Sequence, residues 1–271
     1  MVILKILNNG VSMTLSVAII TLNEEKNLGR TLNSVKDFAD EIIIVDSGST
    51  DRTEEIAKEH NAKFYSQKWL GYGAQRNMAI DLSTSEWILN IDADEEISKD
   101  LAEKIKKIKA GENTYDVYKI NFMSVCFNKK IKYGGWSNTY RIRLFRKKAG
   151  RFNTNNVHEE FITNTEIGKI KDYILHHSYS DLEDYFSKFN KYTTLGAIEY
   201  YKKNKKTNIF SIILNPIYKF LRMYIFRLGF LDGLEGLLLA ITSSLYTMVK
   251  YYKLREIYKN NTYISEVENG N

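Results

Sequence analysis

The run Leu15-Ser-Val-Ala-Ile-Ile-Thr21 is almost wholly apolar and rich in β-branched residues, which is typical of a buried strand. The residues that follow place Leu28, Leu32 and Val35 at helical spacing, which predicts a helix over 24–38. The same alternation continues, with strands predicted at 42–45, 62–65 and 87–91 and helices at 52–60 and 72–82. Strands that alternate with helices predict an α/β fold with a mostly parallel sheet and helices on both faces.

The alternation of strands and helices ends near Ser98. A charged helix reaching about Lys109 is followed by predicted strands at 117–127 and 142–145, with no long helix between them. Consecutive strands without crossover helices pair antiparallel. The sequence therefore predicts an antiparallel extension of the sheet.

The last third of the chain is predicted to be helical. An amphipathic helix at 181–201 precedes the polar hinge 202–206, and two apolar helices are expected within 208–252, divided near 229–233. We therefore expect an N-terminal extension, an α/β domain and a basic, apolar helical region: residues 1–14, 15–200 and 201–271.

The composition is that of a folded globular protein. Hydrophobic residues make up 44% of the 271 residues, charged residues make up 27%, and there is one proline, which excludes disordered and collagen-like chains. The single cysteine, Cys126, excludes an intrachain disulfide and a cysteine-rich zinc site, and favours a reducing, cytoplasmic compartment. The apolar run Met1–Leu7 is short and interrupted by Lys5, so no secretory signal peptide is expected.

The net charge of +6 is confined to the helical region. Residues 1–200 hold 28 basic and 28 acidic side chains, whereas residues 201–271 hold 11 basic and 5 acidic ones. Because this basic region is also apolar, it predicts contact with an anionic membrane surface and not with nucleic acid. The alternative is that its helices pack on the α/β domain or on a second copy of the chain, which would make a homodimer.

Polar clusters follow three of the predicted strands. Thr21-Leu-Asn-Glu24, Asp46 and Asp92-Ala-Asp94 each begin where a strand ends, and the carboxyl ends of parallel strands share one crevice. Asp46 or Asp92 alone is explained as well by a turn or a helix cap. The set of three favours a binding site, and the spacing of Asp92 and Asp94 suits a hard divalent cation that also contacts phosphate oxygens.

These segments together resemble a bacterial family-2 glycosyltransferase with the Rossmann-like GT-A fold. The resemblance rests on Val17-Ala-Ile-Ile-Thr-Leu-Asn-Glu-Glu-Lys-Asn-Leu28, Ile44-Val-Asp-Ser-Gly-Ser-Thr-Asp-Arg-Thr53, Gly73-Ala-Gln-Arg-Asn77 and Asp92-Ala-Asp-Glu95. Three later segments are similar to the branch of lipopolysaccharide inner-core β-1,4-glucosyltransferases: Val157-His-Glu159, His176-His-Ser-Tyr179 and Phe230-Leu-Asp-Gly-Leu-Glu-Gly236.

The resemblance implies an inverting, metal-dependent transferase. It would move a hexose such as glucose from a nucleotide-diphospho-sugar, a UDP-sugar, to a lipid-linked saccharide of the lipopolysaccharide core, with Mg²⁺ or Mn²⁺ as cofactor. Such an enzyme would be peripheral on the cytoplasmic face of the inner membrane. The alternatives are a transferase acting on polyprenyl phosphate or on capsule or exopolysaccharide intermediates, and a catalytically dead nucleotide-sugar-binding membrane scaffold.

The resemblance also implies roles for residues of the donor site. Thr21, Asn23 and Glu24 match the segment that lines the nucleotide pocket, and Asp46 matches the carboxylate that reads the base or ribose. Three more match the surroundings of the diphosphate: Arg76 as a basic residue near the donor, and Asp92 and Asp94 as the metal-diphosphate motif. An ion pair of Arg76 with Asp81 or Glu86 is an equal alternative.

Two further roles are implied in the second half of the chain. Glu159 matches the general base that takes the proton of the acceptor hydroxyl, and its neighbour Glu160 is the alternative, because adjacent side chains of a strand point to opposite faces. His176 matches a histidine that closes the metal site, with His177 or a purely structural role as the alternatives.

Two patterns remain open. Arg141, Arg143 and Arg146 alternate with apolar residues, which favours a solvated strand face, although one or two of them could contact an anionic acceptor. Leu228–Val249 is the span that invites a transmembrane assignment, but Asp232 and Glu235 lie inside it with three glycines. A carboxylate is costly within a spanning helix, so we expect a helical hairpin lying on one membrane surface.

Overall fold

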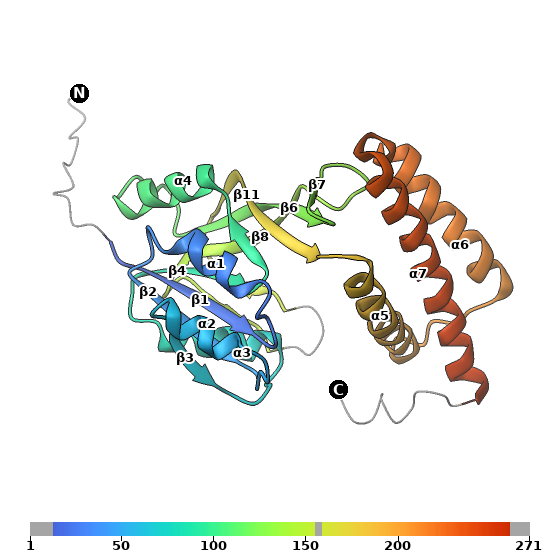
Figure 1. Cartoon of the computed structure of the whole chain (residues 1–271), viewed down its shortest axis with the longest axis horizontal. Coiled ribbons are helices and arrows are strands. Elements are labelled where there is room, and N and C mark those ends of the chain that lie inside the picture. Colours follow the sequence, from blue (N-terminus) through green and yellow to red (C-terminus); the bar gives the residue numbers. More distant parts are fainter. Residues whose placement is uncertain (1–12, 155–158, 261–271) are drawn as a thin grey trace. The chain divides into compact units, whose positions relative to one another are not determined.

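The computed structural model describes residues 13–154 and 159–260. The chain divides into two compact units. The first contains residues up to Phe122 and Thr139–His177, and the second contains Met123–Asn138 and the residues from Ser178 onward. Figure 1 shows the elements of both.

The first unit is built on a mixed sheet. Its parallel half has the order β3-β2-β1-β4, with β1 paired to β2 and to β4. The antiparallel half continues with β8, β6, β11 and β5. The strands span Leu15–Thr21 (β1), Glu41–Asp46 (β2), Lys63–Ser66 (β3), Trp87–Asp92 (β4), Glu95–Ile97 (β5), Val117–Cys126 (β6), Thr139–Arg146 (β8) and Ile167–Tyr179 (β11). The predicted α/β fold with an antiparallel extension is confirmed.

Helices cover both faces of the parallel half, as the uninterrupted apolar strands require. Alternate residues of β1 point to opposite faces: Val17 and Ile19 pack with Leu28 and Leu32 of α1, whereas Ala18 packs with Ile80 of α3. The helices of this unit span Leu28–Val35 (α1), Thr53–Glu59 (α2), Tyr72–Leu82 (α3) and Lys99–Lys109 (α4). Helix α1 is shorter than the predicted 24–38, because turns at 25–27 and 36–38 flank it.

A small two-stranded sheet completes the first unit. Strand β9 (Arg151–Phe152) pairs antiparallel with β10 (Phe161–Ile162). The rings of Phe152 and Phe161 pack edge to face, with their centroids 5.3 Å apart. This hairpin positions the segment that contains Glu159 and Glu160.

The second unit is mostly helical. It contains strand β7 (Lys129–Ile131), α5 (Leu182–Lys202), α6 (Ile209–Leu221), a π-helical turn at Arg222–Phe226, a 3₁₀ turn at Gly229–Asp232 and α7 (Gly233–Asn260). Helix α7 packs against both α5 and α6. The two predicted apolar helices are therefore present. Helix α5 runs across the predicted domain boundary at residues 200 and 201.

Two acidic residues of the second unit have partners inside it. The buried Asp232 carboxylate accepts hydrogen bonds from the backbone N–H groups of Lys132 (3.1 Å) and Tyr133 (2.8 Å). Glu235 forms an ion pair of 2.7 Å with Lys129. Their carboxylates hold the start of α7 to the neighbouring loop.

One helical stretch in the described part of the chain is long and apolar enough to cross a membrane, by length and composition. It is Ile209–Phe226, with a mean hydropathy of 1.3. The sequence expectation had singled out Leu228–Val249 instead. That choice was wrong, because Leu228–Val249 is not one helix: the 3₁₀ turn at Gly229–Asp232 precedes α7, which begins at Gly233.

Candidate active site

The predicted clusters meet at one edge of the parallel sheet. In the strand register Thr21 lies opposite Asp46, and Ile20 lies opposite Asp92. Thr21 and Asp46 are buried and Asp92 is largely so. The carboxyl ends of β1, β2 and β4 thus bring these residues to a common crevice, as their positions at strand ends indicated.

The Asp46 carboxylate organises the loop that follows β2. It accepts hydrogen bonds from the backbone N–H groups of Gly48 (2.8 Å) and Ser49 (2.7 Å). The Asn23 side chain accepts from the backbone N–H of Thr50 (2.8 Å), so the loops after β1 and β2 are bonded to each other. Asp46 therefore acts as a turn residue, the alternative noted above, and a role toward the base or ribose stays a prediction.

Glu24 lies at the turn that leads into α1. Its backbone N–H donates to the Thr53 hydroxyl (2.9 Å), and its carboxylate accepts from the Asn27 side chain (2.8 Å). Glu24 thus joins the starts of α1 and α2 on the same edge of the sheet. Its role in a nucleotide pocket also stays a prediction.

Arg76 of α3 is an ion-pair partner of the Asp92 carboxylate. Its Nη2 lies 2.6 Å from Asp92 Oδ1, and its Nη1 donates to the side-chain oxygen of the buried Asn90 (2.8 Å). Only 4% of the Arg76 side chain is exposed, and Nε lies 3.8 Å from Glu159 Oε1.

The alternative partners considered for Arg76 are wrong. Asp81 pairs with Arg151 (2.5 Å), and Glu86 pairs with Arg146 (3.7 Å). Arg76 instead lies between the carboxylates of Asp92 and Glu159, two residues predicted to belong to the site.

Arg143 of β8 is a site residue that the sequence analysis missed. Its Nη2 contacts Asp92 Oδ2 (3.0 Å) and Glu95 Oε1 (2.6 Å), and its side chain is 3% exposed. The expectation of a solvated strand face is therefore wrong for Arg143. Glu95, which is fully buried, was missed as well; it also accepts a hydrogen bond from the backbone N–H of Asp92 (3.0 Å).

The two carboxylates of this cluster have opposite pKa shifts. Burial raises the pKa of Asp92, but the positive charges of Arg76 and Arg143 outweigh burial and hold it well below its usual range. At Glu95, burial raises the pKa, the charge of Arg143 lowers it, and the charge of Asp92 raises it further. The pKa of Glu95 is therefore raised overall. Asp92 therefore carries the negative charge that the two guanidinium groups balance.

The structure distinguishes the two neighbouring histidines. His176 Nε2 lies 3.2 Å from Asp94 Oδ2, whereas His177 Nε2 lies 2.8 Å from Glu96 Oε2. Burial lowers the pKa of His176, but the hydrogen bond and charge of Asp94 outweigh it and raise the pKa overall. Antiparallel pairing of β11 with β5 sets this arrangement, with His176 opposite Glu95 in register.

The chemistry of these side chains fits a divalent cation held by few protein ligands. Asp94 and His176 are both partly exposed and offer a carboxylate oxygen and an imidazole nitrogen close together. Within residues 13–154 and 159–260 no group of three or more potential ligands is arranged around one point. Mg²⁺ is commonly bound by one or two side chains together with substrate phosphates and water. Asp92 fits less well as a direct ligand, because Arg76 and Arg143 already contact its two oxygens.

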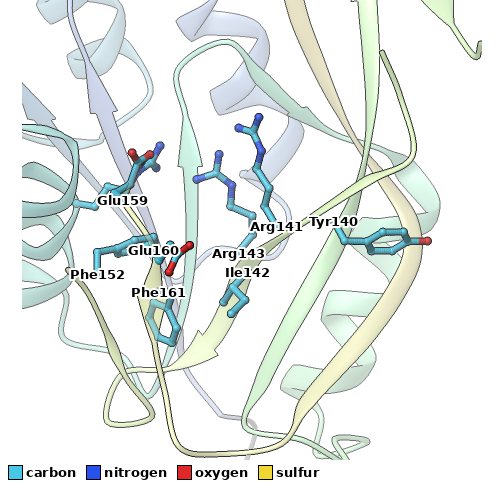
Figure 2. A pocket seen from close by; sticks show the side chains of 9 residues that line it. Tyr140, Arg141, Ile142, Arg143, Phe152, Glu159, Glu160 and Phe161 are labelled. Carbon is cyan, nitrogen blue, oxygen red and sulfur yellow. Dashed lines mark ion pairs between the residues drawn. The ribbon is translucent and has the colours of Figure 1, made fainter. Parts of the chain in front are cut away.

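A cavity of about 680 Å³ opens beside this cluster in the first unit. Figure 2 shows its lining side chains, with Arg141 and Arg143 extending in the same direction from β8 and the two glutamates on the other side. Its lining residues are Arg76, Tyr140, Arg141, Ile142, Arg143, Phe152, Glu159, Glu160 and Phe161. Both candidates for the general base therefore line the same cavity.

Helix α3 holds the backbone that leads to Glu159. The Asn77 side chain donates to the carbonyl of Phe152 (2.8 Å) and accepts from its N–H (3.0 Å). At Gly73 the chain passes so close that an added Cβ would lie 1.8 Å from the carbonyl oxygen of Asn153. The predicted motif 73–77 thus fixes Arg76 and the start of the Glu159 segment together.

Comparison with known proteins gives the family. A family model described as glycosyl transferase family 2 matches residues 16–165. An uncharacterized glycosyltransferase of Rickettsia conorii is 35% identical over 265 residues, which are 92% of this chain and 93% of that protein. The lipopolysaccharide core biosynthesis glycosyltransferase LpsC of Rhizobium meliloti is 31% identical over 254 residues, which are 89% of this chain and 92% of LpsC.

A solved structure shows a more distant likeness. TarS 1–349 of S. aureus in complex with UDP is 19% identical, with 93% of each chain covered and a TM-score of 0.46, too low to support a conclusion about the site. The family model and the relatives that span nearly the whole chain show that this protein belongs to glycosyltransferase family 2, whose GT-A fold its mixed sheet displays.

Proposed function

We propose that the chain is an inverting glycosyltransferase that moves a hexose from a nucleotide-diphospho-sugar, a UDP-sugar, to a lipid-linked saccharide. One observation supports the proposal above all. The Asp94–His176 pair follows directly after the Arg76–Asp92–Arg143 cluster at the end of β4, and Glu159 lies beside Arg76 of the same cluster. A site for an anionic leaving group thus lies beside a carboxylate that can accept a proton.

The chain's own groups divide the work of the reaction. Asp94 and His176 would hold Mg²⁺ or Mn²⁺, which when bound stabilises the negative charge that develops on the leaving diphosphate. Thr21, Asn23, Glu24 and Asp46 would line the nucleoside pocket on the loops that follow β1 and β2.

Proton transfer takes place on the side of the reacting sugar opposite the leaving diphosphate. Glu159 accepts the proton of the attacking hydroxyl, and Arg76 positions its carboxylate from 3.8 Å. Asp92 links α3 to β8 across the site, because it contacts Arg76 of α3 and Arg143 of β8.

The acceptor class is supported by the relative named for lipopolysaccharide core biosynthesis. We infer a saccharide of the lipopolysaccharide core, linked to lipid, at the cytoplasmic face of the inner membrane. A polyprenyl phosphate or a capsule or exopolysaccharide intermediate is the alternative. A catalytically dead scaffold is disfavoured, because Asp94, His176 and Glu159 keep the chemistry that transfer needs.

Nucleotide sugars should stabilise the folded chain in the presence of Mn²⁺. A ligand at 100 times its dissociation constant adds about 2.7 kcal/mol to the free energy of unfolding, which raises the midpoint of thermal unfolding by several degrees. The measurement is a thermal-shift panel of UDP-, GDP-, ADP- and CMP-sugars with and without Mn²⁺. We expect one UDP-sugar to dominate and its effect to depend on the metal. A panel in which no nucleotide sugar shifts the midpoint would contradict the proposal.

The second unit carries a surface suited to an anionic membrane. Helix α6 is apolar on two sides: Ile212 and Pro216 are buried, and the opposite side is exposed, with Phe210 at 65%. The exposed apolar residues of this helix are Ile209, Phe210, Ile213, Leu214, Ile217, Tyr218 and Leu221. An apolar face of this kind favours insertion into the lipid interface.

Basic residues flank that face. Burial, together with the positive charges of Arg222, Arg227 and Lys250, lowers the pKa of Lys219, so these four cations lie near one another. None of the four forms an ion pair with a carboxylate in the described part of the chain. We propose that this end of α6 contacts anionic headgroups while the exposed apolar face enters the interface without spanning the bilayer.

Vesicle binding should therefore have an electrostatic and an apolar component. We expect the full chain to sediment with phosphatidylglycerol vesicles and to be only partly released at about 1 M salt, where charges are screened beyond about 3 Å. The variant Phe210→Ser/Ile213→Ser/Ile217→Ser should be released completely by the same salt. The control Trp69→Ser/Leu70→Ser removes exposed apolar side chains from the first unit and should behave as the wild type. Complete release of the wild type by salt would rule out insertion, and a concentration-dependent dimer that the triple variant abolishes would identify a second copy as the partner.

A further inference from the structure

One cation of the cavity beside the cluster has no acidic partner. Arg76 and Arg143 contact Asp92, and Arg143 also contacts Glu95. Arg141 forms no ion pair with any carboxylate in the part of the chain that the structure describes, although it lines the same cavity. Its guanidinium lies over the Phe122 ring, 5.1 Å from the centroid.

We infer that Arg141 binds an anionic group, a phosphate ester or a carboxylate, carried by the saccharide acceptor. The inference rests on the proposed function and names the acceptor class more closely. It makes Arg141 a residue that selects the acceptor, distinct from the residues that hold the donor.

The position of Arg141 on β8 aims it at the cavity. Arg141 and Arg143 extend to the same side of β8, as Figure 2 shows. Both guanidinium groups contact the Phe122 ring, at 5.1 and 5.4 Å from its centroid. The shared ring holds Arg141 in place before a ligand arrives, which lowers the entropic cost of binding.

The charges around Arg141 favour an incoming anion. The guanidinium of the neighbouring Arg143 repels that of Arg141, and an anion between them would relieve this repulsion. Three nearby carboxylates already contact other arginines: Asp92 and Glu95 contact Arg143, and Glu159 contacts Arg76. Glu160 also lines the cavity but forms no ion pair with Arg141. A phosphate or carboxylate presents two oxygens that match the two parallel N–H groups of a guanidinium.

The donor is a poorer candidate for this contact than the acceptor. The proposed metal ligands, Asp94 and His176, do not line the cavity, whereas the proposed general base Glu159 does. A molecule that reaches Arg141 through the cavity also meets the proposed general base. An acceptor bound there would place its hydroxyl toward Glu159 and its anionic group toward Arg141.

The test compares small probes on the full chain. Thermal stability is measured against increasing glucose 6-phosphate, glucuronate, glucose and inorganic phosphate, and separately against the best nucleotide sugar with Mn²⁺. We expect at least one of the two anionic sugars to stabilise the wild type at concentrations where glucose and inorganic phosphate do not. Which of the two acts more strongly tells whether the natural group is a phosphate or a carboxylate.

Variants of Arg141 then test whether this residue causes the stabilisation by the anionic sugar. Arg141→Gln should raise the half-maximal concentration of the anionic sugar by about tenfold or more, since a charge-assisted bidentate contact is lost. Arg141→Lys should restore part of it, because lysine keeps the charge without the planar fork. Arg255→Gln, which removes one exposed positive charge from α7, is the matched control and should change nothing.

The negative results separate this inference from the proposed function. The inference is wrong if neither anionic sugar stabilises the wild type, if inorganic phosphate acts as well as the sugars, or if Arg141→Gln responds as the wild type does. It is also wrong if Arg141→Gln weakens stabilisation by the nucleotide sugar, because Arg141 would then belong to the donor site. Loss of all donor stabilisation in the wild type would instead contradict the proposed function, and the anionic-sugar measurements would still be read independently.

Discussion

Sugar transfer by the Asp94→Ala variant should fall below detection at limiting Mn²⁺ while the protein remains folded. The Asp94 carboxylate is partly exposed and lies 3.2 Å from Nε2 of His176. The hydrogen bond that ties this position to β11 uses the Asp94 backbone carbonyl, which accepts from the N–H of His177 (3.0 Å) and survives the substitution. Alanine therefore removes the proposed metal ligand and little of the packing.

Glu96→Ala is the control for this loss. Glu96 is a partly exposed carboxylate of β5 that contacts His177 at 2.8 Å, so its removal deletes an acid–histidine contact of the same kind outside the proposed metal site. We expect Glu96→Ala to keep most of the transfer rate and the wild-type dependence on Mn²⁺. Transfer by Asp94→Ala at the wild-type rate would remove Asp94 from the site.

The Glu159→Gln variant should bind the nucleotide sugar normally and turn over about 10²–10⁴-fold more slowly, the range expected when a general base is lost. Glutamine keeps the size of the side chain and a carbonyl oxygen beside Arg76, whose Nε lies 3.8 Å from Glu159 Oε1, but it cannot take a proton at neutral pH. The measurement pairs the turnover rate with the thermal shift produced by the donor.

Glu160→Gln decides between the two adjacent carboxylates. Both side chains line the cavity, but only Glu159 lies beside a buried arginine of the cluster. We expect Glu160→Gln to lose much less activity than Glu159→Gln. The reverse pattern, with normal donor binding in both variants, would move the general base by one residue.

Strand ends were the most predictable part of the site. Thr21, Asp46 and Asp92 each terminate an apolar strand, and parallel strands leave no choice about which edge they share. The position of His176 depended instead on the register of β11 against β5, which joins residues about eighty positions apart in the chain. No local pattern in either segment specifies that register.

Buried charge was the least predictable part. Arg143 alternates with apolar neighbours just as an exposed strand arginine would, and its burial follows from Asp92 and Glu95 lying opposite it in the folded chain. Glu95 and Glu96 are adjacent identical residues in the sequence, yet their carboxylates contact different partners, Arg143 and His177. Such partners become visible only when the antiparallel half of the sheet is in place.

The close approach at Gly73 has a consequence for how sequences of this kind can diverge. A methyl group at this position would collide with the Asn153 carbonyl, so any larger residue must push away the backbone that leads to Glu159. Exposed positions of α3 can drift through many residues, but this one is open to a single amino acid for as long as Arg76 and Glu159 must stay together. New donor or acceptor specificities can therefore arise through changes in the loops. The distance between α3 and the backbone that follows β9 must stay the same.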